Sequence, residues 1–380
     1  MIRLGDVATY INGYAFKPKD RGEEGLPIIR IQDLTGNAYD LGFYDGEYPE
    51  KIEINDGDVL ISWSASLGVY VWNRGKALLN QHIFKVAFDK VEIDRNYFVY
   101  AVRYKLAEMG MKTHGATMKH IVKKDFEATQ IPYPSLKKQV EIANNLDKIL
   151  KIIEARKTEL SLLDNLIKAR FVEMFGSIHD GRYDMKTLPE IVNDDKNSIK
   201  RGPFGGALKK DDFVEDGYLV YEQRHAIHND FEYAKYYITQ GKYEDMIGFK
   251  VIPGDLIISC SGVTLGRIAE VPEGAKEGII NQALLKLSLN PEVMLNTFFI
   301  QQFRGEEIQE ILFGFSRGSG IPNMPSMSEV KAVKFICPPL ELQKQYCDFV
   351  NQVDKSKVAI QAALDKSQLL FDSLMQKYFG

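Results

Sequence analysis

The longest hydrophobic pattern in the chain is a heptad repeat that occurs twice. In residues 139–174, apolar side chains recur at alternating intervals of three and four residues, and neither glycine nor proline interrupts them. Residues 343–378 carry the same pattern in the same frame. A period of about 3.5 residues predicts one long amphipathic helix in each segment. The seam residues that we assign to helix pairing and partner contacts are Ile142, Leu146, Ile149, Ile153, Leu160, Leu163, Ile167, Val350, Val353, Ile360, Leu364 and Phe371.

The same short motifs bound both helix segments. Each segment opens with Pro-x-Leu-x-x-Gln, at 134–139 and at 338–343, and each closes with Phe-Gly, at 175–176 and at 379–380. Proline near the start of a helix and glycine just after its end are typical helix boundaries. The two segments align without a gap between these motifs, which indicates an internal repeat.

The segments before the two helices also resemble each other. Gly-Asp-Val-Leu-Ile-Ser at 57–62 matches Gly-Asp-Leu-Ile-Ile-Ser at 254–259, and Leu-Asn-Gln at 79–81 matches Ile-Asn-Gln at 280–282. Short β-branched and aromatic runs separated by turns predict a mixed α/β unit before each helix. The predicted strands are 26–31, 59–62, 83–88, 218–221, 256–259 and 284–289, and the predicted shorter helices are 97–110 and 293–312.

A long helix with one apolar seam is stable in water only when the seam is packed. The other copy is the expected partner, and the globular unit between the copies allows an antiparallel return; the alternative is two unrelated core helices. We therefore predict an α+β fold with an internal pseudo-twofold repeat, in which two mixed α/β domains are joined by two long antiparallel coiled-coil helices. The predicted segments are 1–133, 134–178, 179–337 and 338–380.

The apolar stripe is wider than a two-helix seam at some turns. Ile152 lies next to Ile153, and Leu162 lies next to Leu163. Such extra apolar surface predicts contacts with helices of partner proteins.

Composition places the chain among ordinary globular proteins, with 45% apolar and 26% charged residues in 380. No run approaches the ~20 apolar residues of a membrane helix, and the N-terminus lacks a signal-peptide pattern. Three cysteines without a C-x-x-C spacing argue against a disulfide framework or structural zinc and favour the cytoplasm. The net charge of −4 argues against unspecific nucleic-acid binding but leaves room for a local basic face.

Polar and basic residues gather in loops at matching places in the two copies. These residue types read base edges and hold phosphates; the alternative for any one of them is a solvated surface. The candidates in the first unit are Lys17, Lys19, Arg21, Arg30, Gln32, Ser62, Trp63, Ser64, His114, Thr117, Lys119 and His120. The candidates in the second unit are Lys200, Arg201, Lys209, Lys210, Gln223, Arg224, His225, Thr264, Arg267, Arg317, Ser319 and Asn323.

Enzymatic motifs are missing from the sequence. There is no G-x-x-x-x-G-K-[ST], no G-x-G-x-x-G after a strand and no H-E-x-x-H. His225 and His228 lack further ligands at a suitable spacing, so we interpret them as loop histidines. Asp58 and Asp255 follow glycines at strand entries, where turn capping is a better explanation than acid–base chemistry. We predict no catalytic residue and no metal ligand in this chain.

Taken together, these features resemble the specificity subunit of type I restriction-modification enzymes. The resemblance covers the whole length and depends on the order domain–helix–domain–helix and on the motifs that open and close each helix. Further motifs that support it are Leu-Gly-Asp-Val at 4–7, the two Gly-Asp strands, Gly-Ala-Thr-Met-Lys-His at 115–120 and Gly-Ile-Pro-Asn-Met at 320–324.

The resemblance implies that each unit is a target recognition domain for one half of a bipartite, asymmetric site in double-stranded DNA. The two helices would set the distance between the half-sites. The subunit itself would be non-catalytic and would bind no cofactor. Two modification subunits that carry S-adenosylmethionine would dock on it and methylate adenine, and restriction subunits would add cleavage that depends on ATP and Mg.

Two alternatives of other classes remain at this stage. One is a self-contained nuclease or methyltransferase on a repeated scaffold, against which the missing motifs argue. The other is a protein-interaction scaffold without a DNA role. A loss of DNA affinity on replacing Lys209, Lys210 and Arg224 would distinguish DNA recognition from this scaffold.

Overall fold

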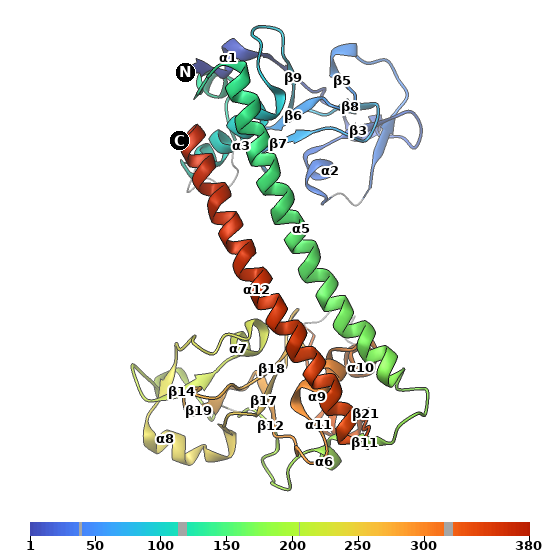
Figure 1. Cartoon of the computed structure of the whole chain (residues 1–380), viewed down its shortest axis with the longest axis vertical. Coiled ribbons are helices and arrows are strands. Elements are labelled where there is room, and N and C mark those ends of the chain that lie inside the picture. The colour runs from blue at the N-terminus through green and yellow to red at the C-terminus, as the bar shows by residue number, and fades with distance from the viewer. Residues whose placement is uncertain (38–39, 113–119, 205, 315–321) are drawn as a thin grey trace. The chain divides into compact units, whose positions relative to one another are not determined.

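The structure is a computed structural model that describes the chain except for residues 38–39, 113–119, 205 and 315–321 (Figure 1). The described residues form two compact units. The first contains Met1–Thr158 together with Gln361–Gly380, and the second contains Glu159–Ile360. Both long helices therefore contribute one part to each unit. The four-segment division of the chain derived from the sequence stays a prediction.

The first unit combines three sheets with helices. Four antiparallel strands in the order β2-β9-β6-β7 form one sheet, and β4-β3-β8-β5, with β3 and β8 parallel, form a second; β1 and β10 pair separately. The elements are β1 (Ile2–Arg3), α1 (Leu4–Val7), β2 (Thr9–Asn12), η1 (Pro18–Asp20), β3 (Leu26–Ile29), α2 (Ile31–Thr35), β4 (Gly42–Tyr44), η2 (Glu50–Ile52), β5 (Glu53–Ile54), β6 (Val59–Ser62), β7 (Gly68–Val71), β8 (Ala77–Leu79), β9 (Ile83–Ala87), α3 (Arg95–Lys112), α4 (Lys123–Ala128), β10 (Gln130–Ile131) and the start of α5 (Leu136–Phe175).

The second unit repeats this topology and adds one strand, β13, at the edge of its second sheet. Its sheets have the orders β12-β20-β17-β18 and β13-β15-β14-β19-β16, with β14 and β19 parallel, and β11 pairs with β21. The elements are β11 (Met185–Thr187), α6 (Leu188–Ile191), β12 (Ile199–Arg201), η3 (Lys210–Asp212), β13 (Phe213–Val214), β14 (Tyr218–Tyr221), α7 (Gln223–His228), β15 (Tyr237–Ile238), α8 (Gln240–Asp245), η4 (Ile247–Phe249), β16 (Lys250–Val251), β17 (Leu256–Ser259), β18 (Ile268–Glu270), β19 (Gly278–Ile280), β20 (Leu284–Leu287), α9 (Asn296–Arg304), α10 (Glu306–Phe313), α11 (Met327–Ala332), β21 (Lys334–Ile336) and α12 (Leu340–Phe379).

The matching Gly-Asp motifs lead into the central strands β6 and β17, all of whose residues are buried. Successive side chains of a strand point to opposite faces. Val59 and Ile61 enter the core beneath α3, whereas Leu60 enters the core between the two sheets. In the second unit, Leu256 likewise enters the core that contains the α9 side chains, and Ile257 enters the core between the two sheets. A strand covered on both faces has a continuous apolar sequence, which is why these strands are predictable.

The glutamine that closes each Pro-x-Leu-x-x-Gln motif is buried and ties the start of a long helix to a shorter helix. The side-chain oxygen of Gln139 accepts a hydrogen bond of 2.9 Å from the backbone N–H of Asp94, just before α3. Gln343 accepts a bond of the same length from the N–H of Leu295, just before α9. The amide nitrogen of each glutamine donates to the carbonyl of the motif's first proline. The motif is therefore a buried hydrogen-bonded joint.

The Phe-Gly motif ends each long helix inside a core. Phe175 closes α5 with no exposed surface and packs on Phe298 and Tyr346 of the second unit. Phe379 closes α12 with no exposed surface and packs on Tyr97 of the first unit. Each core is therefore completed by the start of one long helix and the end of the other.

The two long helices pack against each other in antiparallel directions. In the second unit, Lys357 forms a 2.7 Å ion pair with Asp164, and the Tyr346 hydroxyl donates to the carbonyl of Ile167. In the first unit, Ile142 of α5 lies in the same hydrophobic core as Phe371 of α12. The predicted fold class is confirmed: two mixed α/β domains with a repeated topology and two long paired helices.

Three local predictions were wrong. The strand predicted over 284–289 ends at Leu287. The strand predicted over 26–31 ends at Ile29, because the Asp33 side chain accepts a 2.8 Å hydrogen bond from the N–H of Arg30 and opens α2. The helix predicted over 293–312 is interrupted at Gly305, which has an extended backbone between α9 and α10. Glycine carries a low helix propensity, so it is a natural place for the break.

A lysine four residues after each Asn-Gln pair forms an ion pair with the aspartate that enters the central strand. Lys85 lies 2.9 Å from Asp58, and Lys286 lies 3.6 Å from Asp255. Each aspartate also accepts a backbone N–H three residues earlier, which agrees with turn capping. The side chains of the second pair are 8% and 2% exposed, against 21% and 26% for the first.

Replacing Gln343 by alanine should destabilise the second unit by about 2–4 kcal/mol, because buried backbone groups near Val293, Leu295 and Pro338 lose their partner. Urea unfolding monitored by hydrogen exchange, which separates the two units, measures this. The control is Gln361→Ala, since Gln361 is exposed on the same helix. Equal stability of the two variants would show that the joint is not needed.

The two ion pairs should differ in their contribution to stability. Lys286→Met leaves a buried carboxylate without its cation and should cost about 3 kcal/mol. Lys85→Met acts on a half-exposed, solvent-screened pair and should cost about 1 kcal/mol. Hydrogen exchange of the β17 and β6 amides measures each loss in its own unit. A larger loss for Lys85→Met would contradict this ranking.

Candidate nucleic-acid interface

The structure sorts the predicted DNA-binding residues by their exposure. The exposed candidates are Lys17, Lys19, Gln32, His120, Lys209, Lys210, Arg224, Arg267 and Asn323. The half-buried candidates are Arg21, Arg30, Trp63, Lys200, Arg201, Gln223 and Thr264. The buried candidates are Ser62, Ser64 and His225. His114, Thr117, Lys119, Arg317 and Ser319 lie outside the described residues.

Several candidates have structural tasks instead. Ser62 is fully buried and donates to the carbonyl of Ser66. His225 is fully buried, and its Nδ1 accepts the N–H of Glu222 at 2.9 Å. Both side chains are therefore occupied inside the protein, which argues against the DNA contacts predicted for them. Arg30 is bound by Asp33 at 2.9 Å, which leaves it little freedom to reach a phosphate.

The exposed lysines of the interface lie on one repeated turn in each unit. Lys17 and Lys19 flank the start of η1, and Lys209 and Lys210 lie at the start of η3. In both turns an aspartate three residues after the first lysine accepts its backbone N–H, at 2.8 and 2.7 Å. All four lysines are exposed, but only Lys17 and Lys209 occupy equivalent positions, because Lys19 corresponds to Asp211 and Lys210 corresponds to Pro18. We call these the basic turns; their charge suits phosphate contacts.

The short helices α2 and α7 also match. Asp33 accepts the N–H of Arg30 in the first unit, as His225 does for Glu222 in the second. In this frame the exposed Gln32 corresponds to Arg224. The Arg224 guanidinium lies 4.4 Å from the Tyr233 ring centre and 3.5 Å from Asp230.

A further group of residues gathers where β2, β6 and β9 end in the first unit. We call it the first strand-end corner. The Trp63 ring stacks on Phe84, and its edge contacts His82 and His120, with ring centres 5.0 and 4.8 Å apart. Ser64 pairs with His120 through a β-bridge. The corner comprises Asn12, Trp63, Ser64, Gln81, His82 and His120.

The second strand-end corner lies at the matching ends of β12, β17 and β20. Ser261 pairs with Asn323 through a β-bridge, as Ser64 does with His120. Gln223 donates to the carbonyl and hydroxyl oxygens of Ser261 at 3.1 and 3.0 Å. Cys260 takes the strand position of Trp63. This corner comprises Arg201, Cys260, Ser261, Gln282, Ala283 and Asn323.

Electrostatics distinguish the second corner. Burial raises the pKa of the Cys260 thiol to about 12, and the neighbouring Arg201 guanidinium opposes that shift. Arg201 has no carboxylate within ion-pair distance among the described residues. Its charge is therefore available to an acceptor from outside the chain.

Gln81, Gln282 and His82 belong to these corners but were not among the predicted interface residues. The repeated Asn-Gln pair was visible in the sequence as part of the repeat. Nothing in the sequence indicated that it lies beside the Ser-x-Ser loop, because that proximity is created by strand pairing. Gln81 and Gln282 are both exposed.

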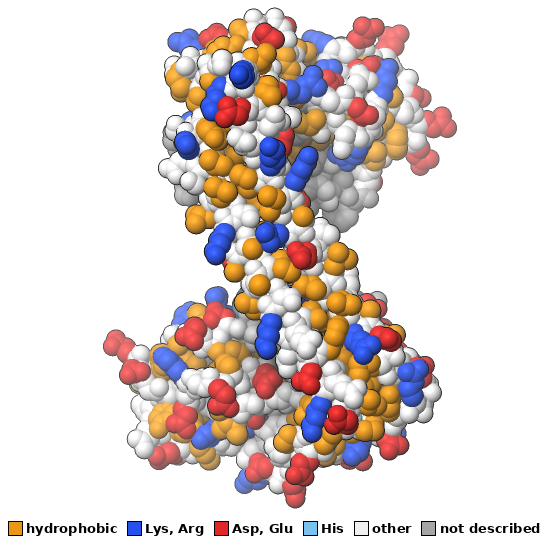
Figure 2. Space-filling view, in the orientation of Figure 1, with side chains coloured by type: hydrophobic (Ala, Val, Ile, Leu, Met, Phe, Trp, Pro, Cys, Tyr) orange, Lys and Arg blue, Asp and Glu red, His pale blue; other side chains and the backbone are white. Residues whose placement is uncertain are grey.

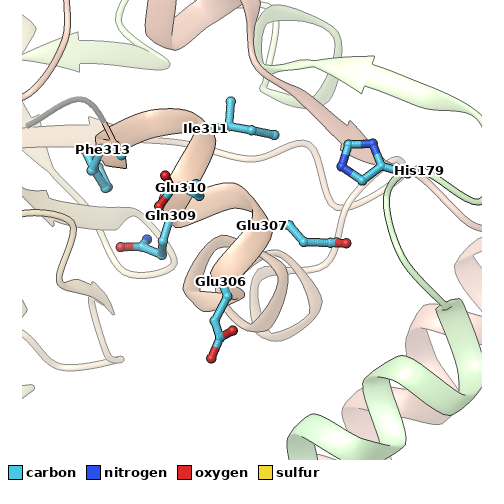
Figure 3. A pocket seen from close by; sticks show the side chains of 8 residues that line it. His179, Glu306, Glu307, Gln309, Glu310, Ile311 and Phe313 are labelled. Carbon is cyan, nitrogen blue, oxygen red and sulfur yellow. The ribbon is translucent and has the colours of Figure 1, made fainter.

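A cavity of about 730 Å³ in the second unit is lined by α10 and the segment after α5 (Figure 3). Glu307 extends from α10 toward the side on which His179 lies. Glu307 accepts the hydroxyl of Ser177 and the N–H of Ile178, which ties this segment to α10. Its carboxylates repel phosphate, so the cavity is not part of the candidate interface.

Apolar side chains remain exposed along the long helices, where Figure 2 shows them as orange patches. Those of the first unit are Leu136, Val140, Ile152, Leu369 and Leu370. Those of the second unit are Leu162, Leu166, Val172 and Val358. The predicted seam residues are buried or half-buried instead. We call the exposed set the helix apolar surface.

No described helix is long and apolar enough to cross a bilayer. No group of three or more His, Cys, Asp or Glu side chains in the described parts of the chain is arranged to hold a metal ion.

The chain is similar to curated specificity subunits. It is 29% identical over 170 residues to the type I restriction enzyme EcoBI specificity subunit of Escherichia coli, a match that covers 44% of this chain and 35% of that protein. It is 25% identical to the MjaVIII specificity subunit of Methanocaldococcus jannaschii, over 51% and 46% of the two chains. These matches span less than half the length of either relative. With the StySPI specificity subunit of Salmonella potsdam it shares 22% identity over 99% of this chain and 87% of that one.

Solved structures show the same fold. The S subunit of a type I restriction-modification system from M. genitalium aligns with a TM-score of 0.56 at 16% identity, over 100% of this chain and 95% of that chain. A chain from a structure that describes complex assembly and conformational transition of the type I R-M system aligns with a TM-score of 0.62 at 14% identity, over 100% and 96%.

The family model described as "Type I restriction modification DNA specificity domain" matches residues 1–163 and 203–368. These ranges include the described residues of both strand-end corners except Arg201, and both basic turns. Because the match extends over more than half of the chain, the protein belongs to the family of type I restriction-modification specificity subunits.

Proposed function

We propose that this chain recognises DNA for a type I restriction-modification complex, with each unit reading one half of a bipartite, asymmetric site. The observation that carries the proposal is the repeat itself. Both units share one topology, one basic turn and one strand-end corner, but they differ in the side chains placed there. Two similar scaffolds with different surfaces suit two different half-sites.

The long helices then set the distance between the half-sites. A helix of 40 residues extends about 60 Å, whereas one turn of B-DNA is ~34–36 Å. The helices are thus long enough to separate two recognition domains by one turn of DNA. Their buried joints and closing phenylalanines attach each helix end to the unit that contains it.

The helix apolar surface is the proposed docking surface for two modification subunits. Single exposed apolar residues are normal, but a series of them along two paired helices is typical of helix–helix interfaces. In this proposal the modification subunits carry S-adenosylmethionine, restriction subunits use ATP and Mg, and this chain contributes recognition without catalysis in the cytoplasm.

The first test is a map of methylated adenines in DNA from cells that carry the modification subunits, with and without this chain. We expect a split motif only when the chain is present. The control is a chain in which residues 1–133 are replaced by the corresponding domain of another family member, which should change one half-site. If verified complexes give the same methylation map with and without this chain, the result would favour a scaffold without a DNA role.

A second test lengthens both helices together. Four residues inserted after Thr158 in α5 and four after Ile360 in α12 add about 6 Å to each helix. At ~3.4 Å per base pair, the non-specific spacer of the methylated motif should grow by one or two base pairs, while both half-sites stay the same.

The matched control for this design is an insertion in α5 alone, which shifts the antiparallel pairing and should reduce assembly. An unaltered spacer in an active complex with both insertions would refute the role of the helices as the spacing element.

A further inference from the structure

Arg201 is a half-buried cation that the protein leaves without a carboxylate partner. Its Nε is buried and forms no hydrogen bond within the described structure. Its guanidinium lies near the Cys260 thiol and 5.7 Å from the Phe204 ring centre. A thiol is a weak acceptor, and buried donors without partners are rare and costly. The arrangement points to an acceptor that comes from outside the chain.

The position of Arg201 is repeated in the first unit by Asn12. Asn12 is the last residue of β2 and Arg201 the last residue of β12, and these strands begin the corresponding four-stranded sheets β2-β9-β6-β7 and β12-β20-β17-β18. Each precedes a glycine. The N–H of Gly13 donates to the carbonyl of Ile83, the first residue of β9, and the N–H of Gly202 donates to the carbonyl of Leu284, the first residue of β20. Asn12 is exposed, and its side-chain amide forms no hydrogen bond within the described residues.

The backbone at this position is fixed in both units. A Cβ on Gly13 would lie 2.0 Å from the carbonyl oxygen of Asn80, and one on Gly202 would lie 1.8 Å from that of Asn281. Only glycine permits this approach of the strand end to the Asn-Gln loop. The residue before the glycine is therefore presented on a rigid support, as recognition requires.

The first strand-end corner also shows the strain that accumulates at functional sites. His82 has a φ of +71° and Ala65 a φ of +57°, in the left-handed region that favours glycine. The His82 Nδ1 and the Trp63 Nε1 are further buried atoms without a hydrogen bond in the described structure. Strained backbone at His82 and at the adjacent Ala65 thus coincides with unpaired polar atoms at this corner, a combination that is typical of functional sites.

The two corners share some residues and differ in others. Ser64 and Gln81 have identical counterparts in Ser261 and Gln282. Asn12 corresponds to Arg201, and Trp63 corresponds to Cys260. Phosphates look alike in any B-DNA, whereas base edges differ. Shared residues therefore suit backbone contacts, and the residues that differ suit the reading of two different half-sites.

From this we infer that Asn12 and Arg201 are specificity-determining residues that contact base edges at equivalent positions of the two half-sites. This inference deepens the proposed function and depends on it. Arginine forms two parallel hydrogen bonds with O6 and N7 of guanine, and asparagine does so with N6 and N7 of adenine. Arg201 accordingly reads guanine, and Asn12 reads adenine.

The test maps methylated adenines for the complete complex with Asn12→Ala and with Arg201→Ala. Each variant should relax one base pair of a different half-site, with a loss of discrimination of about 5- to 150-fold. Arg201→Lys keeps the positive charge but loses the planar fork, so it should relax the same base pair while retaining most of the DNA affinity. A phosphate contact would instead leave the motif intact.

The matched controls are Gln130→Ala and Arg182→Ala, which remove exposed side chains of the same units outside the corners. Assembly with the modification subunits is checked by size-exclusion chromatography; if an alanine variant fails to assemble, Asn12→Ser and Arg201→Lys carry the test. An unchanged motif in assembled variants, or changes in both half-sites at once, overturns the inference. Absence of any split motif with the unaltered chain would instead refute the proposed function.

Discussion

The hydrogen-bonded joint made by a buried glutamine at the start of each long helix is the constraint on which the rest of the structure depends. Gln139 and Gln343 bind the backbone just before α3 and α9, so the first turn of each long helix is attached to the helix that covers the sheet. At the opposite ends, Phe379 and Phe175 complete the cores. Neither core is complete without both long helices, which makes helix pairing part of the folding of each unit.

This shared construction has a consequence for recognition. A side chain at a strand end can discriminate between bases only if the strand end itself is held in place. Lys85 and Lys286 form ion pairs with the aspartates that precede the central strands, and each lysine also donates to a backbone carbonyl of the neighbouring sheet, that of Glu53 or Lys250. Gly13 and Gly202 bring the first strand against the Asn-Gln loop. The backbone of each corner is therefore held by the packed sheet beneath it and by the close contact between the first strand and the Asn-Gln loop. The two corners differ in the side chains that they present.

Comparing the two copies of the repeat also distinguishes polar residues that stabilise the fold from polar residues that are free to contact DNA, which look alike in the sequence. Ser62 and His225 have the chemistry of DNA contacts, yet both are satisfied inside the protein. Lys17 and Lys209 extend into solvent from turns that their own backbone N–H groups stabilise. Comparing matching positions in the two units distinguishes these cases. A residue that stabilises the fold forms the same hydrogen bonds in both units, whereas a residue that recognises DNA can differ between them.

By itself the sequence determined the repeat, the two long helices, the fully buried central strands and the family. Each of these depends on short-range periodicity or on motifs that bound single elements, such as the uninterrupted heptads of α5 and the apolar run of β17. The tertiary structure alone decided which polar residues meet at the strand ends. Arg201 and Cys260 lie far apart in the chain and become neighbours only because β12 and β17 both pair with β20. No local pattern encodes such proximity, since it results from the pairing of distant strands.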